Sequence, residues 1–470
     1  MAGAKRTPRS ASSKAARSSS TSASSRKGRT STAAKSSRAS SSFEGFRSSK
    51  KAAPAKKGRS GSSRNALGNA RPSNRSVPAD AEAFTRFTGI RSMLNPLWCY
   101  HGFRIAVIIL TCFGVVMVFS SSAVTMISAG VSPWKQALSQ GMYCVLGLVL
   151  GFVAMKLPVG FYQRFSGLFL IIAIILQLLT LTPLGVEVNG NTGWINIAGV
   201  FTMQPAEVMK LALCVWLPQA MSIAQQRAAK QGDKAFLFPT LMFGACLGAV
   251  MLGKDLGTAM IVVFIGATAF IIGGFPWKWM LAIIGALGAL ILAVVITSPN
   301  RLNRIFAAYG DCSGEDALSV CYQSVHAKYA MASGGLWGVG IGNSREKWNY
   351  LPEAHNDFIF AIIGEEMGFI GAAMVILLFV VLGWCLLCVA VKTKDRYVSM
   401  VLVCVTVWLV GQGLVNIMVV VGLLPVMGVP MPFVSAGGSS LIMCLAAAGV
   451  AISMMRSHPH VHADVSALRS

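Results

Sequence analysis

The sequence predicts an all-α polytopic membrane protein with about ten transmembrane helices and a large extracytoplasmic loop before the eighth. Hydrophobic residues make up 54% of the 470 residues, while charged residues make up only 12%, well below the ~25% of soluble domains. Several apolar runs are long enough to cross ~30 Å of hydrocarbon. The length that remains leaves no room for a large soluble enzyme domain.

Residues 1–95 form a basic tail that precedes the first apolar run. They contain 21 Lys and Arg against three acids, so +18 (21 − 3) of the net charge of +24 lies there. The tail lacks the apolar surface that would offset the entropy of ordering, and it has no secretory signal pattern, so we expect a disordered segment. Binding to anionic lipid or to nucleic acid is an alternative, but we favour a solvated cytoplasmic tail without a nucleic-acid partner.

The predicted spans follow in order, and they give a membrane domain over residues 96–457 and a short cytoplasmic tail over 458–470. They lie near residues 103–126, 136–155, 164–185, 205–222, 235–252, 257–273, 277–297, 357–391, 397–423 and 437–455. Alternate loops are rich in Lys and Arg, and the positive-inside rule assigns these loops and both termini to the cytoplasm. The outer side then receives the loop 186–204, which has no Lys or Arg, and the long loop 298–356. A long ordered loop in a compact protein is usually functional.

The long loop ends in LPEAHNDFIFAIIGEE, which places acids at the start of the eighth span. Asp357 is either an acid at a helix N-terminus, favoured by the helix dipole, or a general base beside His355. Glu365 and Glu366 come eight and nine residues later, ~12–13.5 Å further along a continuous helix. Acids at that depth need a partner or a polar cavity, and the sequence leaves both interpretations open.

A second motif, QPAEVMK, begins the fourth span at Gln204. Pro205 suits a first helical turn, and Glu207 lies on the same helix face as Lys210. Lys210 either snorkels toward the membrane surface or pairs with a carboxylate such as Glu207 or Asp357.

Two further segments interrupt the apolar pattern. GKDLGTA at 253–259 reads as a turn between two spans. In the stretch 416–440, prolines and glycines break the helix near the outer face, which membranes tolerate where the backbone is buried or lines a cavity. Neither a nucleotide-binding motif nor a metal-ligand spacing is present in the sequence, so we assign no metal ligands.

Together these motifs resemble the SEDS family of peptidoglycan polymerases, which includes FtsW, RodA and SpoVE. The resemblance covers about residues 100–457, and the stretch from Asn416 to Ser440 matches the family signature. Ala354 is typical of the FtsW branch, and the run before it is similar to actinobacterial members.

The resemblance implies a peptidoglycan glycosyltransferase that polymerises lipid II during cell division and releases undecaprenyl pyrophosphate. Asp357 matches the family's catalytic aspartate, and Lys210 matches its supporting lysine. Supporting or substrate-binding roles are implied for Glu207, His355, Glu353, Gln204, Ser435, Gly437 and Gly438. A lipid II flippase and a non-catalytic septal scaffold are the alternatives.

The resemblance also implies partners and a location. The partners are lipid II, undecaprenyl-linked glycan, a class B penicillin-binding transpeptidase and other divisome proteins. The location is the bacterial cell membrane at the division septum. A divalent cation, Mg²⁺ or Mn²⁺, is left open as a cofactor.

The sequence departs from the family pattern in the outer loops. Gly193 stands where the family usually has Arg, and Lys254 follows Gly253 where Pro is usual. Cys312 and Cys321 lie in the long outer loop, where oxidising conditions allow a disulfide, and we predict that they form one. Most other cysteines lie in apolar runs and are expected to be packing residues.

Overall fold

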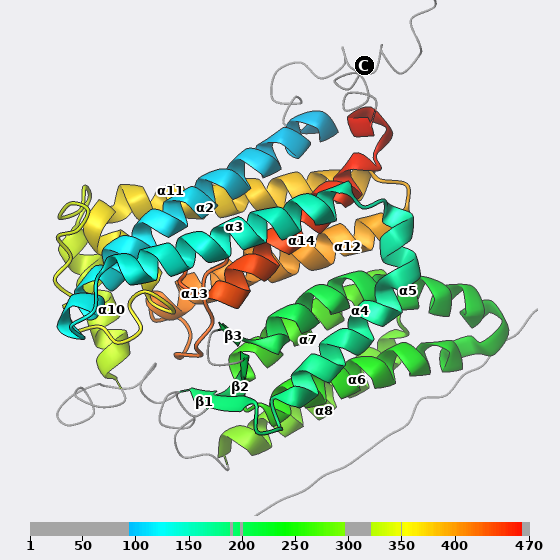
Figure 1. Ribbon diagram of the computed structural model, residues 1–470. Helices are drawn as coiled ribbons and strands as arrows, with labels where there is room; N and C mark the ends of the chain where they lie inside the picture. The colour runs from blue at the N-terminus through cyan, green and yellow to red at the C-terminus, as the bar shows by residue number, and fades with distance from the viewer. Residues whose placement is uncertain (1–93, 189–190, 198–200, 297–320, 349, 463–470) are drawn as a thin grey trace, which may run out of the picture. The chain divides into compact units, whose positions relative to one another are not determined.

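The computed structural model describes residues 94–188, 191–197, 201–296, 321–348 and 350–462, and these residues form a helical membrane domain (Figure 1). The predicted basic tail lies outside this range, apart from its last two residues. The helices of the first half are α2 (Pro96–Ser128), α3 (Trp134–Lys156), α4 (Val159–Leu179), α5 (Pro205–Gln231), α6 (Leu237–Leu252), α7 (Leu256–Ile272) and α8 (Trp277–Ile296). A 3₁₀ turn, Gly232–Phe236, joins α5 to α6.

The second half begins with α10 (Tyr322–Gly334) and α11 (Ile359–Lys392). The segment Arg396–Val420 is helical throughout and consists of α12 (Arg396–Thr406), a π-helical turn (Val407–Gly411) and α13 (Gln412–Val420). The last helix is α14 (Gly438–Arg456).

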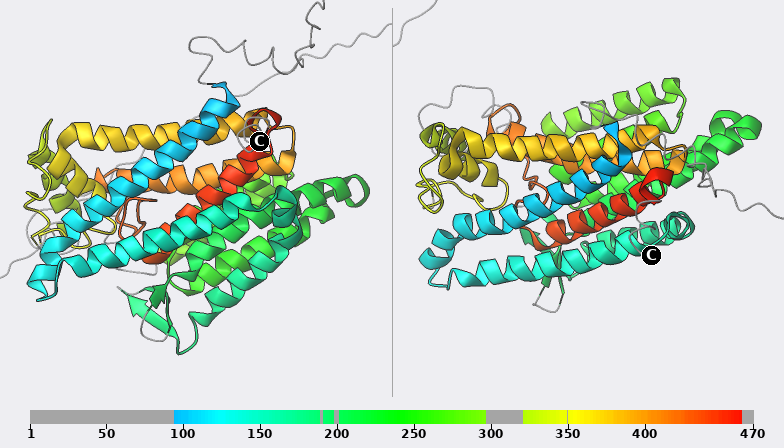
Figure 2. Two further views of the ribbon diagram at one scale, coloured as in Figure 1. Left: turned by 45° about the horizontal axis from the view of Figure 1, so that its top comes forward. Right: turned by 90° about the horizontal axis from the view of Figure 1, so that it is seen from above.

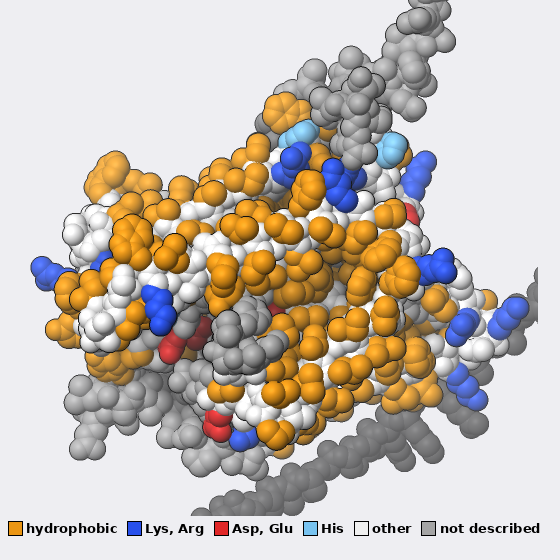
Figure 3. Space-filling model, in the orientation of Figure 1, with side chains coloured by type: hydrophobic (Ala, Val, Ile, Leu, Met, Phe, Trp, Pro, Cys, Tyr) orange, Lys and Arg blue, Asp and Glu red, His pale blue; other side chains and the backbone are white. Residues whose placement is uncertain are grey.

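Apart from α10, which lies in the predicted long loop 298–356, the helices overlap the apolar segments that the sequence predicts. Within the described residues, seven helices are long and apolar enough to cross a membrane, with α5 and α6 counted together as one. Helix α7 and the first part of α8 are apolar but shorter. The polytopic, mainly helical fold is therefore confirmed, whereas ten crossings remain a prediction. Hydrophobic side chains cover most of the visible face, and charged side chains lie mainly toward the helix ends (Figure 3).

Helix α5 lies between two groups of helices. It packs against α4, α6 and α7 on one side and against α12 and α14 on the other. Helix α2 packs against α3 and α11, and α3 packs along α14, as all three views show (Figures 1 and 2). Small residues permit the last contact, because a Cβ atom on Gly151 would lie 2.7 Å from the Leu445 carbonyl oxygen. Because α5 lies between the two groups of helices, its first turns, with the QPAEVMK motif, lie in the interior.

A small antiparallel sheet in the loop between α4 and α5 differs from the all-helical expectation. It consists of β1 (Gly185–Val188), β2 (Asn191–Ile197) and β3 (Phe201–Met203), in the order β1-β2-β3. Trp194 pairs with Val186, and Ile195 pairs with Met203. This loop has no Lys or Arg and is rich in β-branched residues, which suits paired strands.

The sheet contacts the turn that follows α6. The Thr192 amide donates to the Gly253 carbonyl over 3.1 Å. A Cβ atom on Gly253 would lie 3.4 Å from the Gly193 Cα atom. The two segments that depart from the family pattern therefore lie side by side in the fold.

Helix α11 is interrupted at Gly368, whose φ of 68° and ψ of −166° are not helical. The expected single helix 357–391 is therefore wrong, and two helical parts, 359–367 and 369–392, replace it. The loop after α10 binds the interrupted backbone. The Phe369 amide donates to the Gly335 carbonyl over 2.9 Å, and the Val339 amide donates to the Glu365 carbonyl over 3.0 Å.

Candidate active site

Asp357 lies at the end of the turn 351–358 that leads into α11. The helix begins at Ile359, and its N-cap residue, Phe358, makes no capping bond through its side chain. Asp357 precedes the N-cap residue, so the alternatives of an acid favoured by the helix dipole and a general base both stay predictions. A Cβ atom on Gly428 would lie 3.6 Å from Asp357 Oδ2, so the carboxylate faces the non-helical segment between α13 and α14.

The turn before Asp357 is organised around Glu353. This residue has a φ of 55°, which is uncommon for a residue other than glycine. Its carbonyl accepts from the Asn356 amide over 3.0 Å and from the Phe358 amide over 3.3 Å. Its carboxylate accepts from Asn356 Nδ2 over 2.5 Å. The predicted supporting role of Glu353 thus has a geometric basis, since Glu353 shapes the turn that presents Asp357.

Three consecutive carbonyls of this turn accept hydrogen bonds from the stretch 416–440. The Ala436 amide donates to the His355 carbonyl over 2.9 Å. Ser435 Oγ donates to the Asn356 carbonyl over 2.6 Å, and Asn416 Nδ2 donates to the Asp357 carbonyl over 2.7 Å. The motif stretch therefore holds the backbone of the turn.

Burial lowers the pKa of His355 below its ordinary value of 6.5, and the Glu353 carboxylate opposes this effect in part. The imidazole is therefore neutral at neutral pH. A neutral imidazole adds no positive charge beside Asp357.

Lys210 is fully buried in α5, with 1% of its side chain exposed, so the snorkelling interpretation is wrong. Its ammonium group lies 2.8 Å from Glu207 Oε1 and 2.8 Å from Gln412 Oε1. It also lies over the Trp408 ring, 5.2 Å from the centroid. Of the two carboxylates considered as partners, the structure pairs Lys210 with Glu207. The second oxygen of Glu207 is buried without a hydrogen-bond partner among the described residues.

Gln412 joins the Lys210 pair to the segment that faces Asp357. Its amide nitrogen donates to the Pro430 carbonyl over 2.8 Å. One turn further along, Asn416 Nδ2 donates to the Val429 carbonyl over 2.8 Å and also holds the Asp357 carbonyl. Lys210 therefore acts on the surroundings of Asp357 through α13 and residues 429–430.

Gln204 links three parts of the fold beside this network. Its amide nitrogen in the side chain donates to Asp255 Oδ2 over 2.6 Å, and its backbone amide donates to Ser439 Oγ over 3.2 Å. Asp255 also caps α7 by accepting from the Thr258 amide over 2.9 Å. The turn interpretation of GKDLGTA is consistent with this geometry.

Gly437 and Gly438 begin the last helix. Gly437 is the N-cap residue of α14. A Cβ atom on Gly438 would lie 2.6 Å from the Tyr143 ring, so the glycine permits the close approach of α3. Their geometry gives these two residues a packing role, and a substrate-binding role remains a prediction.

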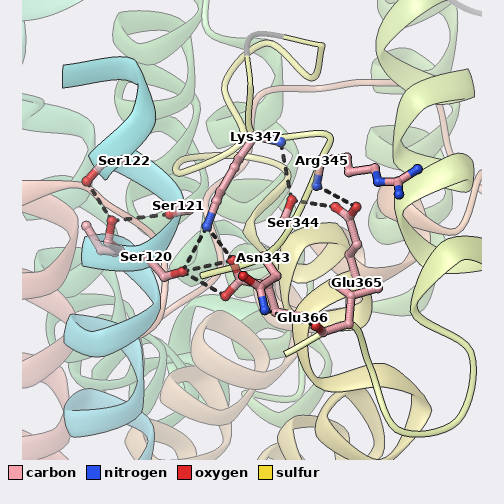
Figure 4. Close-up of polar contacts among 11 residues, drawn as sticks. Ser120, Ser121, Ser122, Asn343, Ser344, Arg345, Lys347, Glu365 and Glu366 are labelled. Carbon is pink, nitrogen blue, oxygen red and sulfur yellow. Dashed lines mark hydrogen bonds and ion pairs between the residues drawn. The ribbon is translucent and has the colours of Figure 1, made fainter. Parts of the chain in front are cut away.

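Glu365 and Glu366 are bound by protein groups, which decides between the two interpretations that the sequence left open. Ser344 Oγ donates to Glu365 over 2.5 Å, and Lys347 Nζ lies 2.8 Å from Glu366 (Figure 4). Because α11 breaks at Gly368, both acids end the helical part 359–367, and they do not lie deep within one continuous helix.

Sequence reasoning missed Gln412 and Lys347. Gln412 could have been found, since a buried amide in an apolar helix, one turn before Asn416, is a signal of function. Nothing in the sequence indicated that Lys347 is buried in an ion pair, because its partner Glu366 lies on the other side of the Asp357 turn in the sequence. Among the described residues, no three His, Cys, Asp or Glu side chains gather into a group that could hold a metal ion.

Cys321 is disulfide-bonded, whereas the other nine described cysteines are free. Cys312 lies outside the described residues, so the pairing of Cys312 with Cys321 stays a prediction.

The geometry defines a class of protein: a polytopic helical membrane protein in which a buried polar framework holds a carboxylate in the turn before α11. The profile of the FtsW/RodA/SpoVE family, described as cell cycle proteins, matches residues 100–460. The chain belongs to this family.

Relatives of known name and solved structure are consistent with this membership. The chain is 32% identical over 403 residues to the probable peptidoglycan glycosyltransferase FtsW of Mycobacterium tuberculosis, which covers 85% of this chain and 75% of the relative. It is 35% identical over 360 residues to the stage V sporulation protein E of Bacillus subtilis, covering 75% and 95%.

Two solved structures share the fold. One comes from a study of how a peptidoglycan synthase complex coordinates polymerization and crosslinking, with a TM-score of 0.60, 25% identity and coverage of 76% of this chain and 98% of that chain. The other is the rod shape determining protein RodA of Thermus thermophilus, with a TM-score of 0.56, 25% identity and coverage of 77% and 97%.

Proposed function

We propose that the protein is a peptidoglycan glycosyltransferase that polymerises lipid II into glycan strands. The observation that carries this proposal is the placement of Asp357, whose backbone is held by the family signature stretch and whose carboxylate faces Gly428. A fixed carboxylate suits a general base, because catalysis by proton transfer depends on position as well as pKa.

In the proposed reaction, the Asp357 carboxylate takes the proton from the 4-hydroxyl of the acceptor sugar. The freed oxygen attacks the anomeric carbon of the donor sugar and forms the new glycosidic bond. The bond from that carbon to the pyrophosphate breaks, and undecaprenyl pyrophosphate leaves with the electron pair. Both substrates are anchored in lipid, so their sugars meet at the outer surface, where the positive-inside rule places the turn of Asp357.

The Lys210–Glu207 pair supports this chemistry indirectly. Its ammonium binds Gln412, and Gln412 with Asn416 holds the backbone at Val429 and Pro430 opposite the catalytic turn. We assign Lys210, Glu207, Gln204 and Ser435 to positioning, and His355 and Glu353 to the shape of the turn.

We also propose a setting for the enzyme. It acts at the division septum of the cell membrane, with both termini in the cytoplasm, together with a class B penicillin-binding transpeptidase and other divisome proteins. The similarity to a chain from a peptidoglycan synthase complex supports a partner of this kind.

The test is polymerisation of lipid II by the purified full-length protein. Asp357→Asn keeps the shape of the side chain and removes the base, so we expect glycan synthesis to fall by about 10²–10⁴-fold. Asp233→Asn, on an exposed turn, is the matched control and should leave the rate unchanged. Near-normal synthesis by Asp357→Asn would contradict the mechanism. Transfer of lipid II across liposomes without polymerisation would favour a flippase instead.

A further inference from the structure

A second buried polar cluster takes no part in the proposed chemistry (Figure 4). Lys347, from the outer loop, pairs with Glu366 of α11 over 2.8 Å, and their side chains are only 3% and 0% exposed. Ser120 of α2 places its hydroxyl oxygen 2.8 and 2.7 Å from the two oxygens of Glu366. The cluster therefore joins three segments that are far apart in the sequence.

The neighbouring acid is bound in the same way. Glu365 accepts from Ser344 Oγ over 2.5 Å and from the Arg345 amide over 2.8 Å. The Lys347 amide in turn donates to Ser344 Oγ over 3.2 Å. Two adjacent acids at the end of the helical part 359–367 are thus both held by residues 344–347.

These contacts close a loop that contains the catalytic turn. Lys347 lies ten residues before Asp357 and Glu366 lies nine residues after it, so their ion pair joins the two ends of the segment. The middle of the same segment is held by Asn416 and Ser435. Fixing the ends of a segment removes conformations in which its middle would be displaced.

Stability alone does not account for this ion pair. Replacing a buried pair by apolar residues of similar volume is often neutral or stabilising, because taking two charges out of water offsets their attraction. The backbone at the break in α11 is already bound, since the Val339 and Gly340 amides donate to the Glu365 and Glu366 carbonyls over 3.0 Å each. The charged pair adds a directional link from the loop to α2.

We propose that Lys347 and Glu366, together with Ser120, are positioning residues that hold the Asp357 turn in its reactive geometry against α2. The inference rests on the proposed glycosyltransferase function. A displacement of about 1 Å at a reacting group can cost on the order of 10²-fold in rate, so loss of the link reduces turnover more than substrate affinity.

The test compares three variants of the full-length protein. Lys347→Met and Glu366→Gln each leave a buried group without its partner, and we expect both to lower the melting temperature. The double variant removes both charges and should melt close to the unchanged protein. We expect its kcat for lipid II polymerisation to remain about 10- to 100-fold low, with KM changed by less than about 3-fold. A stable double variant with restored kcat would overturn the proposal.

A second measurement does not depend on activity. Hydrogen–deuterium exchange of peptides from residues 347–358 should be faster in the double variant, with exchange elsewhere unchanged. The control replaces the exposed pair of Lys278 and Asp233, which are 2.7 Å apart, by Met and Asn, and should alter neither kcat nor exchange.

Unchanged exchange in residues 347–358 of the double variant would overturn the proposal even if kcat fell. If the unchanged protein polymerises no lipid II, the proposed function fails. The exchange experiment then still decides whether the pair holds the turn.

Discussion

At the scale of single residues, the main feature of this protein is its buried charged side chains. Lys210 has two oxygen partners and an aromatic ring around its ammonium, so its charge is compensated inside the membrane domain. Removing one member of a buried ion pair is far more costly than removing both, because the remaining charge is left uncompensated. Substitutions at Lys210 should therefore affect stability and activity together.

The first prediction concerns Lys210. We expect Lys210→Met to lower the free energy of unfolding by about 3–5 kcal/mol and to reduce polymerisation severely. Lys210→Arg should restore stability in part, because a planar guanidinium cannot reproduce both contacts of an ammonium. Denaturant unfolding in detergent and a lipid II assay measure the two effects. A Lys210→Met protein with normal stability and normal rate would contradict the assigned pairing.

The second prediction concerns pH. Because burial lowers the pKa of His355, the unfolded chain binds a proton there at a higher pH than the folded protein does. The folded state therefore loses stability as pH falls below 6.5, toward the lowered pKa of the folded protein. When the pH is lowered from 7.5 to about 5.5, the melting temperature of His355→Gln should fall by less than that of the unchanged protein. Equal losses in the two proteins would refute this assignment.

His458 provides an internal comparison for the pH experiment. Its pKa is also lowered, first by burial and then by the neighbouring His460. It lies after α14, far along the chain from the catalytic turn. His458→Gln should reduce the acid sensitivity of folding in the same direction, but without the loss of polymerisation that a change at His355 is expected to cause.

At the scale of elements, the break in α11 ends the helical part that follows the catalytic turn. Gly368 adopts a φ of 68°, and a Cβ atom there would meet the Gly338 amide and the Leu336 carbonyl. We predict that Gly368→Ala is destabilising, by ~1–3 kcal/mol because φ of 68° with ψ of −166° is accessible essentially only to glycine, and by a further cost from the clash. Thermal unfolding in detergent measures the loss.

Gly288→Ala is the matched control for this change. A Cβ atom at Gly288 of α8 would meet nothing within 4 Å. Alanine favours a helix over glycine by ~1 kcal/mol, so this variant should be as stable as the unchanged protein or more so. Equal behaviour of the two alanine variants would show that the break does not need glycine.

The elements also show what could be predicted from the sequence. Apolar runs predict the membrane helices, because the cost of exposing polar backbone to lipid leaves few alternatives. The pairing of Lys210 with Glu207 followed from their spacing on one helix face. The pairing of Lys347 with Glu366 could not be predicted in this way, because it depends on the break in α11. That break is bound by backbone contacts with Gly335 and Leu336, which lie far from it in the sequence. The small sheet was missed because two of its three strands, β1 and β3, have only four and three residues.

At the scale of the whole molecule, the basic tail and the catalytic turn are expected on opposite sides of the membrane. We predict that removal of residues 1–90 leaves polymerisation in detergent unchanged, because no tail residue is expected to reach the outer face. The rate of a truncated protein with an unchanged melting temperature is the measurement. A lower rate in that protein would show that the tail contributes to catalysis.

The last prediction concerns the surface for the proposed transpeptidase. Large apolar residues on the membrane part of α11 are exposed at intervals of seven residues: Ile370, Leu377, Trp384 and Val391. Val380 and Leu387 fall between them, and together they give the spacing that a single packed helix partner requires. By contrast, no large hydrophobic side chain of α12 is exposed.

We therefore expect a photocrosslinker at Leu377 or Trp384 to capture the membrane helix of a class B transpeptidase in cells. Leu377 is 61% exposed and Trp384 is 51% exposed, so a crosslinker at either site can reach a neighbouring helix. The control site is Ile171 of α4, which is 52% exposed but belongs to the other group of helices. Mass spectrometry of the crosslinked peptide identifies the partner segment. Capture at Ile171 in place of the two α11 sites would place the partner on the early helices, and a seven-residue spacing on α11 would then reflect contact with lipid alone.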